Sequence, residues 1–395
     1  MPGLDDVMLF KPLTLRGVTI PNRVVIAPMQ MYMATKDGFY TDWHLVHLGR
    51  YAIGKAGLIF TEVLCVEPRG RSTYSDAGIW DDAHVGPLKR VADFLRSCGS
   101  VPGVQIGHCG PKAARQRPHE GLKPLGPAEA AKGEPPWTPV ASTDEPSDAG
   151  YHVPHALTTS EVQDLVATFG RCAARVAPHF DVLDIHAAHG YLIHTFLSPI
   201  ANKRTDRYGG DRQGRMRFAL EIAEAVRAAW PQDKPIFFRL SCIDRAPGGW
   251  EMPDTLALAQ ELRARGIDVI DCSSGGIRGA NSIAIFKKIG PPAPGYQVPF
   301  AAEVKKTLGM PTMAVGLIAE AKHAEAILRA GDADLVAIAR EALANPHWAL
   351  HASNELQADP NFTFDYWPPN HAWWLQYREE IRRMGRTGAK KDAAA

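Results

Sequence analysis

The sequence predicts an α/β fold in which eight parallel strands and their intervening helices close into a (β/α)8 barrel, the TIM-barrel architecture. Short apolar runs recur eight times along the 395 residues, and helical patterns lie between them. The runs do not alternate between apolar and polar residues, which is typical of parallel strands buried on both faces. Barrels of this kind reach this length as one domain, so we expect residues 1–395 to form a single domain.

Each expected strand is short and rich in leucine or β-branched residues. The competing fold with the same alternation is a doubly wound open sheet, but no GxGxxG sequence follows an early strand. In chain order the strands are expected at Val24–Ala27, Leu58–Val66, Val101–Ile106, Val182–His186, Pro235–Leu240, Val269–Ser273, Thr312–Val315 and Leu335–Ile338.

Capping signals mark the ends of several helices. Thr158-x-x-Glu161 is a capping box, and an apolar face at helical spacing follows it. Asp254 is expected to cap the helix TLALAQELRARG that follows it, and Gly266 is expected to end that helix. Two further helices are expected over Met216–Trp230 and Ala319–Ala330.

Two regions interrupt the alternation of strands and helices. Residues from about 115 to 155, rich in Pro, Gly and charge, follow the third strand. A long insertion in a compact domain indicates a lid or binding loop, or else surface decoration. Residues from about 357 to 380 form an aromatic arm, expected to pack on the barrel or on a neighbouring subunit. The tail, residues 385–395, is expected to fray.

Composition argues against several classes of function. The net charge of +1 gives no electrostatic reason to bind nucleic acid or an anionic membrane. The six cysteines form no CxxC pair, so neither a zinc knuckle nor an iron–sulfur cluster is expected. No run approaches the roughly 18 apolar residues of a membrane span, and MPGLDDVMLF does not resemble a signal peptide. We therefore expect a reducing, cytoplasmic location.

Candidate functional residues lie where the expected strands end, because active residues of such barrels sit at the carboxyl ends of the strands. In chain order they are Ala27-Pro28-Met29-Gln30-Met31-Tyr32, Gln105-Ile106-Gly107-His108, His186-Ala187-Ala188-His189-Gly190-Tyr191, Arg239, Gly316 and Ala339-Arg340.

His186, His189 and Tyr191 form the most informative cluster. Two imidazoles could donate hydrogen bonds to one substrate oxygen and stabilise charge that develops there. A nearby tyrosine could deliver a proton as general acid. HxxH can also be part of a zinc site, although no further ligand cluster completes it. The third alternative is that both histidines bond backbone carbonyls and only shape the loop.

The remaining strand-end residues suggest a phosphate-bearing cofactor. Gly316 and Ala339-Arg340 follow the seventh and eighth strands, where many barrels bind phosphate. The alternative is a turn glycine and a surface cation. Gln105 and Arg239 are polar residues within apolar strands and need partners. A flavin ring could supply them, and an internal ion pair would serve Arg239 equally well.

Taken together, long segments of the chain resemble the old yellow enzyme family of FMN-dependent ene-reductases, and most closely its bacterial branch that includes xenobiotic reductases. The resemblance covers nearly the whole chain. Its segments are LFKPLTLRGVTIPNRVVIAPM, DWHLVHLGRYAIGKAGLIFTE, HAAHGYLIHTFLSPIANKRTDRYGG, the strand with Arg239, LVAIAREALANPHW and HAWWLQYR. HAAHGYL followed by NKRTDRYGG is the most specific of them.

The resemblance implies a role for each candidate residue. FMN would be held by Ala27, Pro28, Met29, Gln30, Val63, Gln105, Arg239, Gly316, Ala339 and Arg340. The substrate would meet Tyr32, His186 and His189, with Tyr191 as proton donor. Trp374, in the aromatic arm, would reach the active site of a neighbour in a homodimer or homotetramer. No metal is implied.

The resemblance also implies a mechanism with two half-reactions at one site. NADPH or NADH would reduce the tightly bound, non-covalent FMN. An enone, nitroalkene or maleimide would then take hydride from flavin N5 and a proton from Tyr191. The residues alone leave two alternatives: a flavin-free barrel hydrolase or aldolase using a metal or Lys112, and a non-catalytic scaffold.

Three positions depart from the family pattern. Gln30 stands where relatives usually have Cys or Thr beside the flavin, and Pro111 where they commonly have Arg. Val315 stands where close relatives can have an aromatic pocket residue. These departures bear on flavin potential and substrate scope rather than on the identity of the cofactor.

Overall fold

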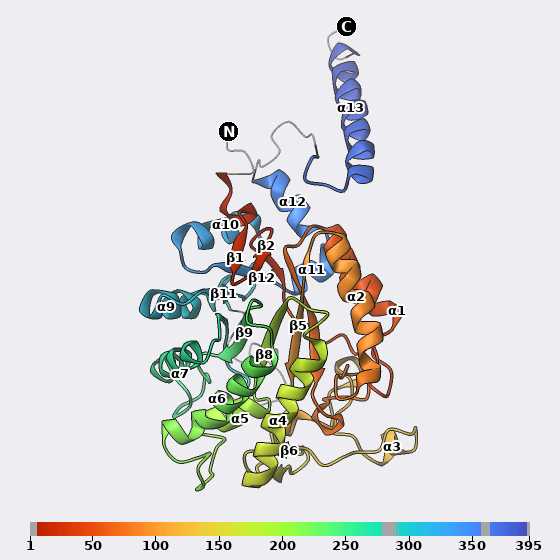
Figure 1. The fold of residues 1–395 in the computed structure, drawn as a ribbon. Coiled ribbons are helices and arrows are strands. Elements are labelled where there is room, and N and C mark those ends of the chain that lie inside the picture. The colour runs from red at the N-terminus through yellow and green to blue at the C-terminus, as the bar shows by residue number, and fades with distance from the viewer. Residues whose placement is uncertain (1–5, 279–289, 291, 357–363, 393–395) are drawn as a thin grey trace.

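The computed structural model describes residues 6–278, 290, 292–356 and 364–392, with side chains up to residue 384. Within these residues eight parallel strands close into a barrel, each paired with its neighbours in chain order (Figure 1). All the expected strands are present, with ends within one residue of those predicted, so the predicted barrel is confirmed. They are β3 (Val24–Ile26), β4 (Leu58–Cys65), β5 (Val101–Gly107), β8 (Val182–Ala187), β9 (Ile236–Ser241), β10 (Val269–Ser273), β11 (Thr312–Ala314) and β12 (Leu335–Ile338).

Alternate residues of each strand belong to two separate layers of the core. Phe237 of β9 joins a cluster inside the barrel, where its ring lies 5.7 Å from that of Phe60 of β4. Phe238, the next residue, joins the larger cluster between the strands and the helices. Both faces of each strand are therefore buried, which explains the unbroken apolar runs in the sequence.

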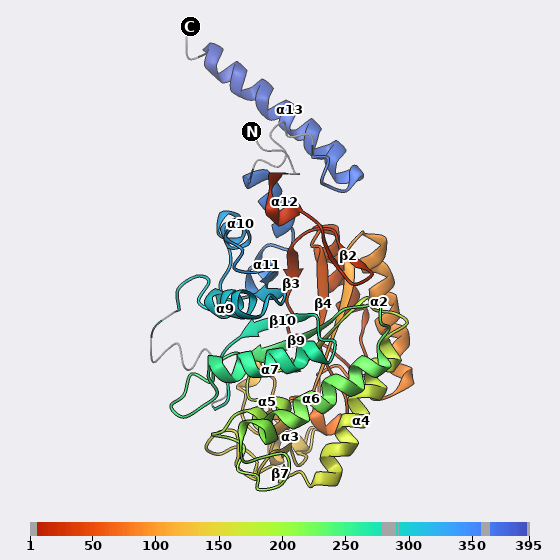
Figure 2. The ribbon, with the colours of Figure 1, turned by 60° about the vertical axis from the view of Figure 1, so that its left-hand side comes forward.

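Helices surround the barrel on its outer side (Figures 1 and 2). The capping box at Thr158 is confirmed: Glu161 Oε2 accepts from the Thr158 amide at 2.7 Å. Asp254 is not the N-cap of its helix, because α7 begins at Met252 after Glu251; it is the third helical residue, and its carboxylate accepts from the Glu251 amide at 3.2 Å in a capping box. The helices are α1 (Asp42–Ile53), α2 (Val85–Ser97), α4 (Thr159–Val176), α5 (Leu192–Leu197), α6 (Arg212–Ala229), α7 (Met252–Ala264), α9 (Val298–Leu308), α10 (Ala321–Ala330), α11 (Arg340–Ala344) and α12 (Trp348–Glu355).

A short hairpin closes the end of the barrel where the strands begin. It consists of β1 (Leu13–Leu15) and β2 (Val18–Ile20), which pair antiparallel. Leu15 and Ile20 are buried in the same cluster as the residues inside the barrel. Side chains therefore fill this end of the barrel.

The insertion expected at residues 115–155 leaves the barrel at the opposite, open end, where the strands terminate, after β5. It carries the short helix α3 (Pro127–Ala130) and the two-residue strands β6 (Val140–Ala141) and β7 (His155–Ala156). In both views it lies at the end of the barrel away from the two termini (Figures 1 and 2). This placement puts the insertion beside any ligand bound at the ends of the strands.

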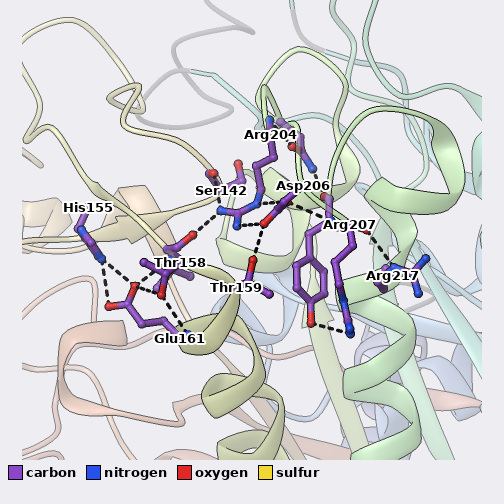
Figure 3. A network of polar contacts seen from close by, with 12 residues as sticks. Ser142, His155, Thr158, Thr159, Glu161, Arg204, Asp206, Arg207 and Arg217 are labelled. Carbon is purple, nitrogen blue, oxygen red and sulfur yellow. Dashed lines mark hydrogen bonds and ion pairs between the residues drawn. The ribbon is translucent and has the colours of Figure 1, made fainter.

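Arg204 fastens the insertion to the loop that follows α5 (Figure 3). Its guanidinium donates to the backbone carbonyls of Ser142, after β6, and Leu157, after β7, and pairs with the Asp206 carboxylate. Asp206 in turn accepts a hydrogen bond of 2.8 Å from Thr159, in the first turn of α4. The segment NKRTDRYGG therefore ties the insertion, α4 and the β8 loop together.

The aromatic arm ends in the helix α13 (Pro369–Asp392), which stands clear of the barrel in both views (Figures 1 and 2). Trp373, Trp374 and Tyr377 are exposed on it. The backbone of residues 385–392, expected to fray, is helical, and residues 357–363 and 393–395 lie outside the described residues. Of the helices in the described part of the chain, none combines the length and the apolar character that crossing a membrane requires.

Candidate active site

The fold brings most of the predicted site residues to the open end of the barrel. His186 is the last residue but one of β8, with His189 and Tyr191 in the segment beyond the strand, and Arg239 lies in the neighbouring strand β9. The other residues come from the remaining strands: Ala27–Gln30 and Tyr32 after β3, Val63 in β4, Gln105 in β5, Gly316 after β11, and Ala339 and Arg340 after β12.

The two histidines contact each other and continue into a hydrogen-bonded chain. His189 Nδ1 lies 3.4 Å from His186 Nε2, and His189 Nε2 lies 2.7 Å from Ser273 Oγ at the end of β10. The ring of Tyr191 packs edge-on against that of His186, with centroids 5.0 Å apart. Three groups from β8 and the segment that follows it thus share one side of the site.

The loop that carries these groups is held in an uncommon backbone conformation. His189 has a φ of 62°, in the left-handed region that non-glycine residues seldom adopt. Its amide donates to Ser241 Oγ at 3.0 Å, and its carbonyl accepts from Lys112 Nζ at 2.8 Å. Gly190, next in the chain, donates its amide to His194 Nδ1 at 2.8 Å. These contacts from separate elements hold the conformation despite its cost.

Burial keeps both imidazoles uncharged near neutral pH. Loss of hydration, followed by the nearby positive charge of Arg239, lowers the pKa of His186 and of His189 well below the usual value for histidine. A neutral imidazole has one N–H donor and one acceptor nitrogen. The pair can therefore donate hydrogen bonds to a substrate oxygen without bringing a net charge into the site.

The Tyr191 hydroxyl is bonded to a residue that follows β3, which β4 and β5 separate from β8 in the barrel. It donates to Gln30 Oε1 at 2.9 Å, and Gln30 Nε2 donates to the carboxylate of Asp76 at 2.8 Å. Burial raises the pKa of Tyr191 well above its usual value, so the phenol holds its proton. Asp76 was not among the predicted site residues.

Two carboxylates inside the barrel hold the polar side chains of the strands. Gln105 Nε2 donates to Asp184 Oδ2 at 2.7 Å, and Arg239 Nε lies 3.3 Å from Asp271 Oδ2. Burial raises the pKa of Asp184 and of Asp271. The internal ion pair foreseen as one alternative for Arg239 is therefore present.

A pocket of about 410 Å³ opens beside this ion pair. Arg239 and His189 line one side, and the segment from Val315 to Ala319 lines the other. The remaining lining residues are Ser273, Tyr296, Gln297, Ala337, Ala339, Arg340 and Glu341. The pocket thus joins the predicted phosphate residues to one of the predicted catalytic histidines.

Gly316 shapes the wall of this pocket. Its φ is +129°, and a Cβ at this position would lie 3.2 Å from Tyr296 Cε1 and 3.3 Å from Gln297 Nε2. A side chain would therefore be both strained and crowded. A glycine here lets the backbone approach a ligand closely, which agrees with a role beyond that of a simple turn.

Sequence and structure comparisons agree on the family. The chain is 39% identical over 353 residues to an NADPH dehydrogenase of Geobacillus sp. (strain WCH70), covering 89% of this chain and 95% of that protein. It is 39% identical to the NADPH dehydrogenase of Bacillus subtilis (strain 168), at 89% and 96% coverage. Residues 8–359 match the NADH:flavin oxidoreductase / NADH oxidase family. The chain belongs to this family.

Solved structures of the same fold align with this chain over about nine-tenths of its length. A morphinone reductase in complex with tetrahydroNAD has a TM-score of 0.71 and 26% identity, over 91% of this chain and 92% of that chain. An old yellow enzyme homologue from Zymomonas mobilis has the same TM-score at 24% identity, over 90% and 93% of the two chains. The predicted resemblance to the old yellow enzyme family is confirmed.

Family membership confirms the predicted class of enzyme and its cofactors. The protein is an FMN-dependent NAD(P)H oxidoreductase, so the flavin-free and non-catalytic alternatives fall away. The residues present fit FMN: among the described residues Arg239 makes its ion pair and no hydrogen bond, although it is buried and borders the pocket. An anionic or carbonyl-bearing ring would supply the partners that this guanidinium lacks.

The contacts of Lys112 and of the two histidines support neither lysine catalysis nor metal catalysis, the two chemistries considered for a flavin-free enzyme. Lys112 Nζ bonds the carbonyls of His189 and Gly276, which gives it a bridging role between two loops. Among the described residues, the one cluster with metal-ligand spacing is Cys65, Asp76 and Cys109, which does not include His186 or His189. The histidine pair therefore has no third ligand in the part of the chain that the structure describes.

Trp374 does not join the other predicted site residues within one chain. It lies on α13 and is 63% exposed, and this helix stands at the opposite end of the barrel from α3 of the insertion (Figure 1). Its predicted contact with a neighbour's site stays a prediction.

Several residues of the site were not predicted from the sequence. Asp76 lies in the loop after β4, and Asp184, Asp271 and Ser273 lie in strands otherwise apolar. The two strand aspartates carried a signal that could have found them, since a carboxylate inside a buried strand needs a partner. No pattern marked Asp76 or Gln297, because their contacts come from distant segments.

Proposed function

We propose that this enzyme is an ene-reductase, which reduces the activated C=C bond of enones, nitroalkenes or maleimides with NADPH or NADH as hydride donor. One observation carries this proposal: two uncharged imidazoles and a neutral tyrosine share one side of a site beside a buried arginine. Such a site can polarise a carbonyl or nitro oxygen and deliver one proton.

Residues from several strands would hold the FMN. Arg239, already fixed by Asp271, would face the pyrimidine part of the ring, and Gln105 would bond its edge. Gly316, Ala339 and Arg340 would bind the phosphate through backbone amides and one guanidinium. Ala27, Pro28, Met29, Gln30 and Val63 would complete the flavin site. When bound, FMN supplies the two-electron hydride chemistry of the enzyme.

His186 and His189 would bind the oxygen of the acceptor group. Hydrogen bonds from neutral donors strengthen as negative charge develops on that oxygen, which favours the transition state over the ground state. Ser273 holds one side of the His189 ring and so orients it. Tyr32, at φ 59° after β3, would line the same pocket.

Tyr191 would protonate the α-carbon of the substrate. Its proton is retained to high pH because burial raises the pKa of the phenol. The ring is fixed by its edge contact with His186, so the donor and the carbonyl-binding group keep a constant separation. A tyrosine is a weak acid, and it is suited to protonating a carbon that becomes strongly basic only after hydride addition.

The comparisons support parts of this proposal. Relatives in Geobacillus and Bacillus are named NADPH dehydrogenases, which favours NADPH over NADH as donor. A neighbour of the same fold is named morphinone reductase, which favours a cyclic enone as acceptor. The exposed aromatic face of α13 favours a homodimer or homotetramer in which Trp374 meets another subunit.

Product analysis tests the proposal. The enzyme with FMN is incubated with NADPH and 2-cyclohexenone in D2O, and the product is examined by NMR. We expect cyclohexanone with one deuterium at the α-carbon, and little product from Tyr191→Phe. Consumption of NADPH without saturated product would contradict the ene-reductase assignment while leaving the flavin enzyme intact.

A further inference from the structure

Gln30 connects the expected proton donor to a buried carboxylate. Tyr191 Oη lies 2.9 Å from Gln30 Oε1, and Gln30 Nε2 lies 2.8 Å from Asp76 Oδ2. The three side chains come from the loops after β8, β3 and β4. They therefore form a continuous chain of hydrogen bonds across the open end of the barrel.

The carboxylate determines the direction of every bond in this chain. An ionised carboxylate accepts hydrogen bonds and donates none, so the amide nitrogen of Gln30 must face Asp76. The amide oxygen of Gln30 then faces Tyr191, whose hydroxyl must be the donor. Asp76 thus decides where the Tyr191 proton points, although the two residues do not touch.

Burial and hydrogen bonds hold the Asp76 carboxylate in place. It is fully buried, and it accepts from the Ser72 amide at 2.6 Å and from Thr73 Oγ1 at 2.7 Å. Burial raises its pKa to about 6, against these two hydrogen bonds, so it is ionised at pH 8. The titratable and charged groups that face it are Glu62 and Cys65 of β4, Cys109 and Arg115 after β5, Tyr32 after β3, and Tyr191.

We propose that Asp76 is a positioning residue for the protonation step and acts through Gln30, whose amide it orients so that the Tyr191 hydroxyl keeps a single direction. This inference rests on the proposed function, since it assigns Tyr191 the role of proton donor. It also gives Gln30, where relatives usually have Cys or Thr, a task in proton delivery.

Variants of the two residues should show one shared defect. Asp76→Ala removes the acceptor that orients the amide, and Gln30→Met removes the amide while nearly keeping its volume. If Asp76 acts through Gln30, the double variant should be no slower than either single variant. Asp76→Asn keeps one oxygen toward Gln30 and can turn its nitrogen to the Thr73 hydroxyl, so it should restore most of the rate.

The two half-reactions, followed separately by anaerobic stopped-flow, locate the defect. In Asp76→Ala we expect reduction by NADPH to stay within about twofold. In both variants we expect reoxidation by 2-cyclohexenone to slow at least about tenfold with a larger solvent deuterium isotope effect. Glu325→Gln is the matched control, because Glu325 is a buried carboxylate that accepts the amides of Met8 and Leu9 far from the site. It should leave both half-reactions unchanged. If Asp76→Ala does not fold, Asp76→Ser replaces it.

A second readout needs no turnover. Tyrosine labelled with carbon-13 at Cζ reports ionisation of the phenol, and Tyr191→Phe assigns the resonance. A hydrogen bond donated to Gln30 favours the neutral phenol, so the pKa of Tyr191 should fall by at least about one unit in Asp76→Ala and Gln30→Met. Glu325→Gln should leave it unchanged.

Each outcome separates the two proposals. Wild-type enzyme that is reduced by NADPH but not reoxidised by the enone would overturn the proposed function. Wild-type enzyme competent in both half-reactions, with additive defects in Asp76→Ala and Gln30→Met or with an unchanged Tyr191 pKa, would overturn the positioning role alone.

Discussion

Arg239 and Asp271 form an ion pair inside the barrel, with Nε and Oδ2 3.3 Å apart on the adjacent strands β9 and β10. Both side chains are buried, and the guanidinium reaches the wall of the pocket. A buried cation is costly unless compensated, and Asp271 compensates it before any ligand arrives. The barrel therefore presents a fixed positive group at the place where a flavin would bind.

Arg239→Met should weaken FMN binding at least about tenfold and destabilise the protein by about 3 kcal/mol, because Asp271 is left buried without its partner. Titration of apoprotein with FMN, followed by quenching of flavin fluorescence, gives the affinity, and urea unfolding gives the stability. Adding Asp271→Leu should recover the stability and not the affinity. Recovery of both would mean that Arg239 does not contact the cofactor.

Gly316→Ala should lower FMN affinity because the new methyl group would crowd Tyr296 and Gln297 at a φ of +129°. Gly331→Ala is the matched control: its φ is +77°, and a Cβ there would have no neighbour within 4 Å. Both variants should lose about 1 kcal/mol of stability from backbone strain. Equal FMN affinity in the two variants would contradict a ligand-contact role for Gly316.

The stability of the protein should rise with pH above 7 because of Lys112. Burial lowers its pKa to about 7 from the usual lysine value of 10.5. Between these values the unfolded chain binds the proton and the folded chain does not, so the free energy of unfolding increases by up to about 1.4 kcal/mol per pH unit. Urea unfolding from pH 7 to 10 should show this slope in the wild type and a smaller one in Lys112→Met. The same slope in Lys112→Met as in the wild type would contradict a lowered pKa of Lys112 as its cause.

Arg204→Met should loosen the insertion without unfolding the barrel. The variant loses the hydrogen bonds to the Ser142 and Leu157 carbonyls, while the hydrogen bond from Thr159 to Asp206 remains (Figure 3). Hydrogen exchange of residues 140–157 should become faster, while exchange in β9 and β10 stays slow. Arg217→Met, on the far side of the same network, is the control and should leave the insertion protected.

The barrel could be predicted closely from the sequence because each buried parallel strand is an unbroken apolar run. The HAAHGY loop could be found because polar residues directly follow such a run. Asp76 could not, since it is defined by its contact with Gln30 from a distant segment. Lys112 was named only as a candidate catalytic lysine, whereas it bonds the carbonyls of His189 and Gly276. The start of α7 was misplaced because Asp254 bonds back to Glu251 from within the first turn.

The central claim is tested most directly by anaerobic stopped-flow measurement of the purified protein in the visible band of oxidised flavin. NADPH and NADH are added in separate experiments, and 2-cyclohexenone follows. The account predicts that the flavin absorbance is lost on addition of NADPH and returns on addition of the enone, with the return strongly slowed in Tyr191→Phe. Absorbance that is lost but does not return with the enone in the wild type would contradict the account.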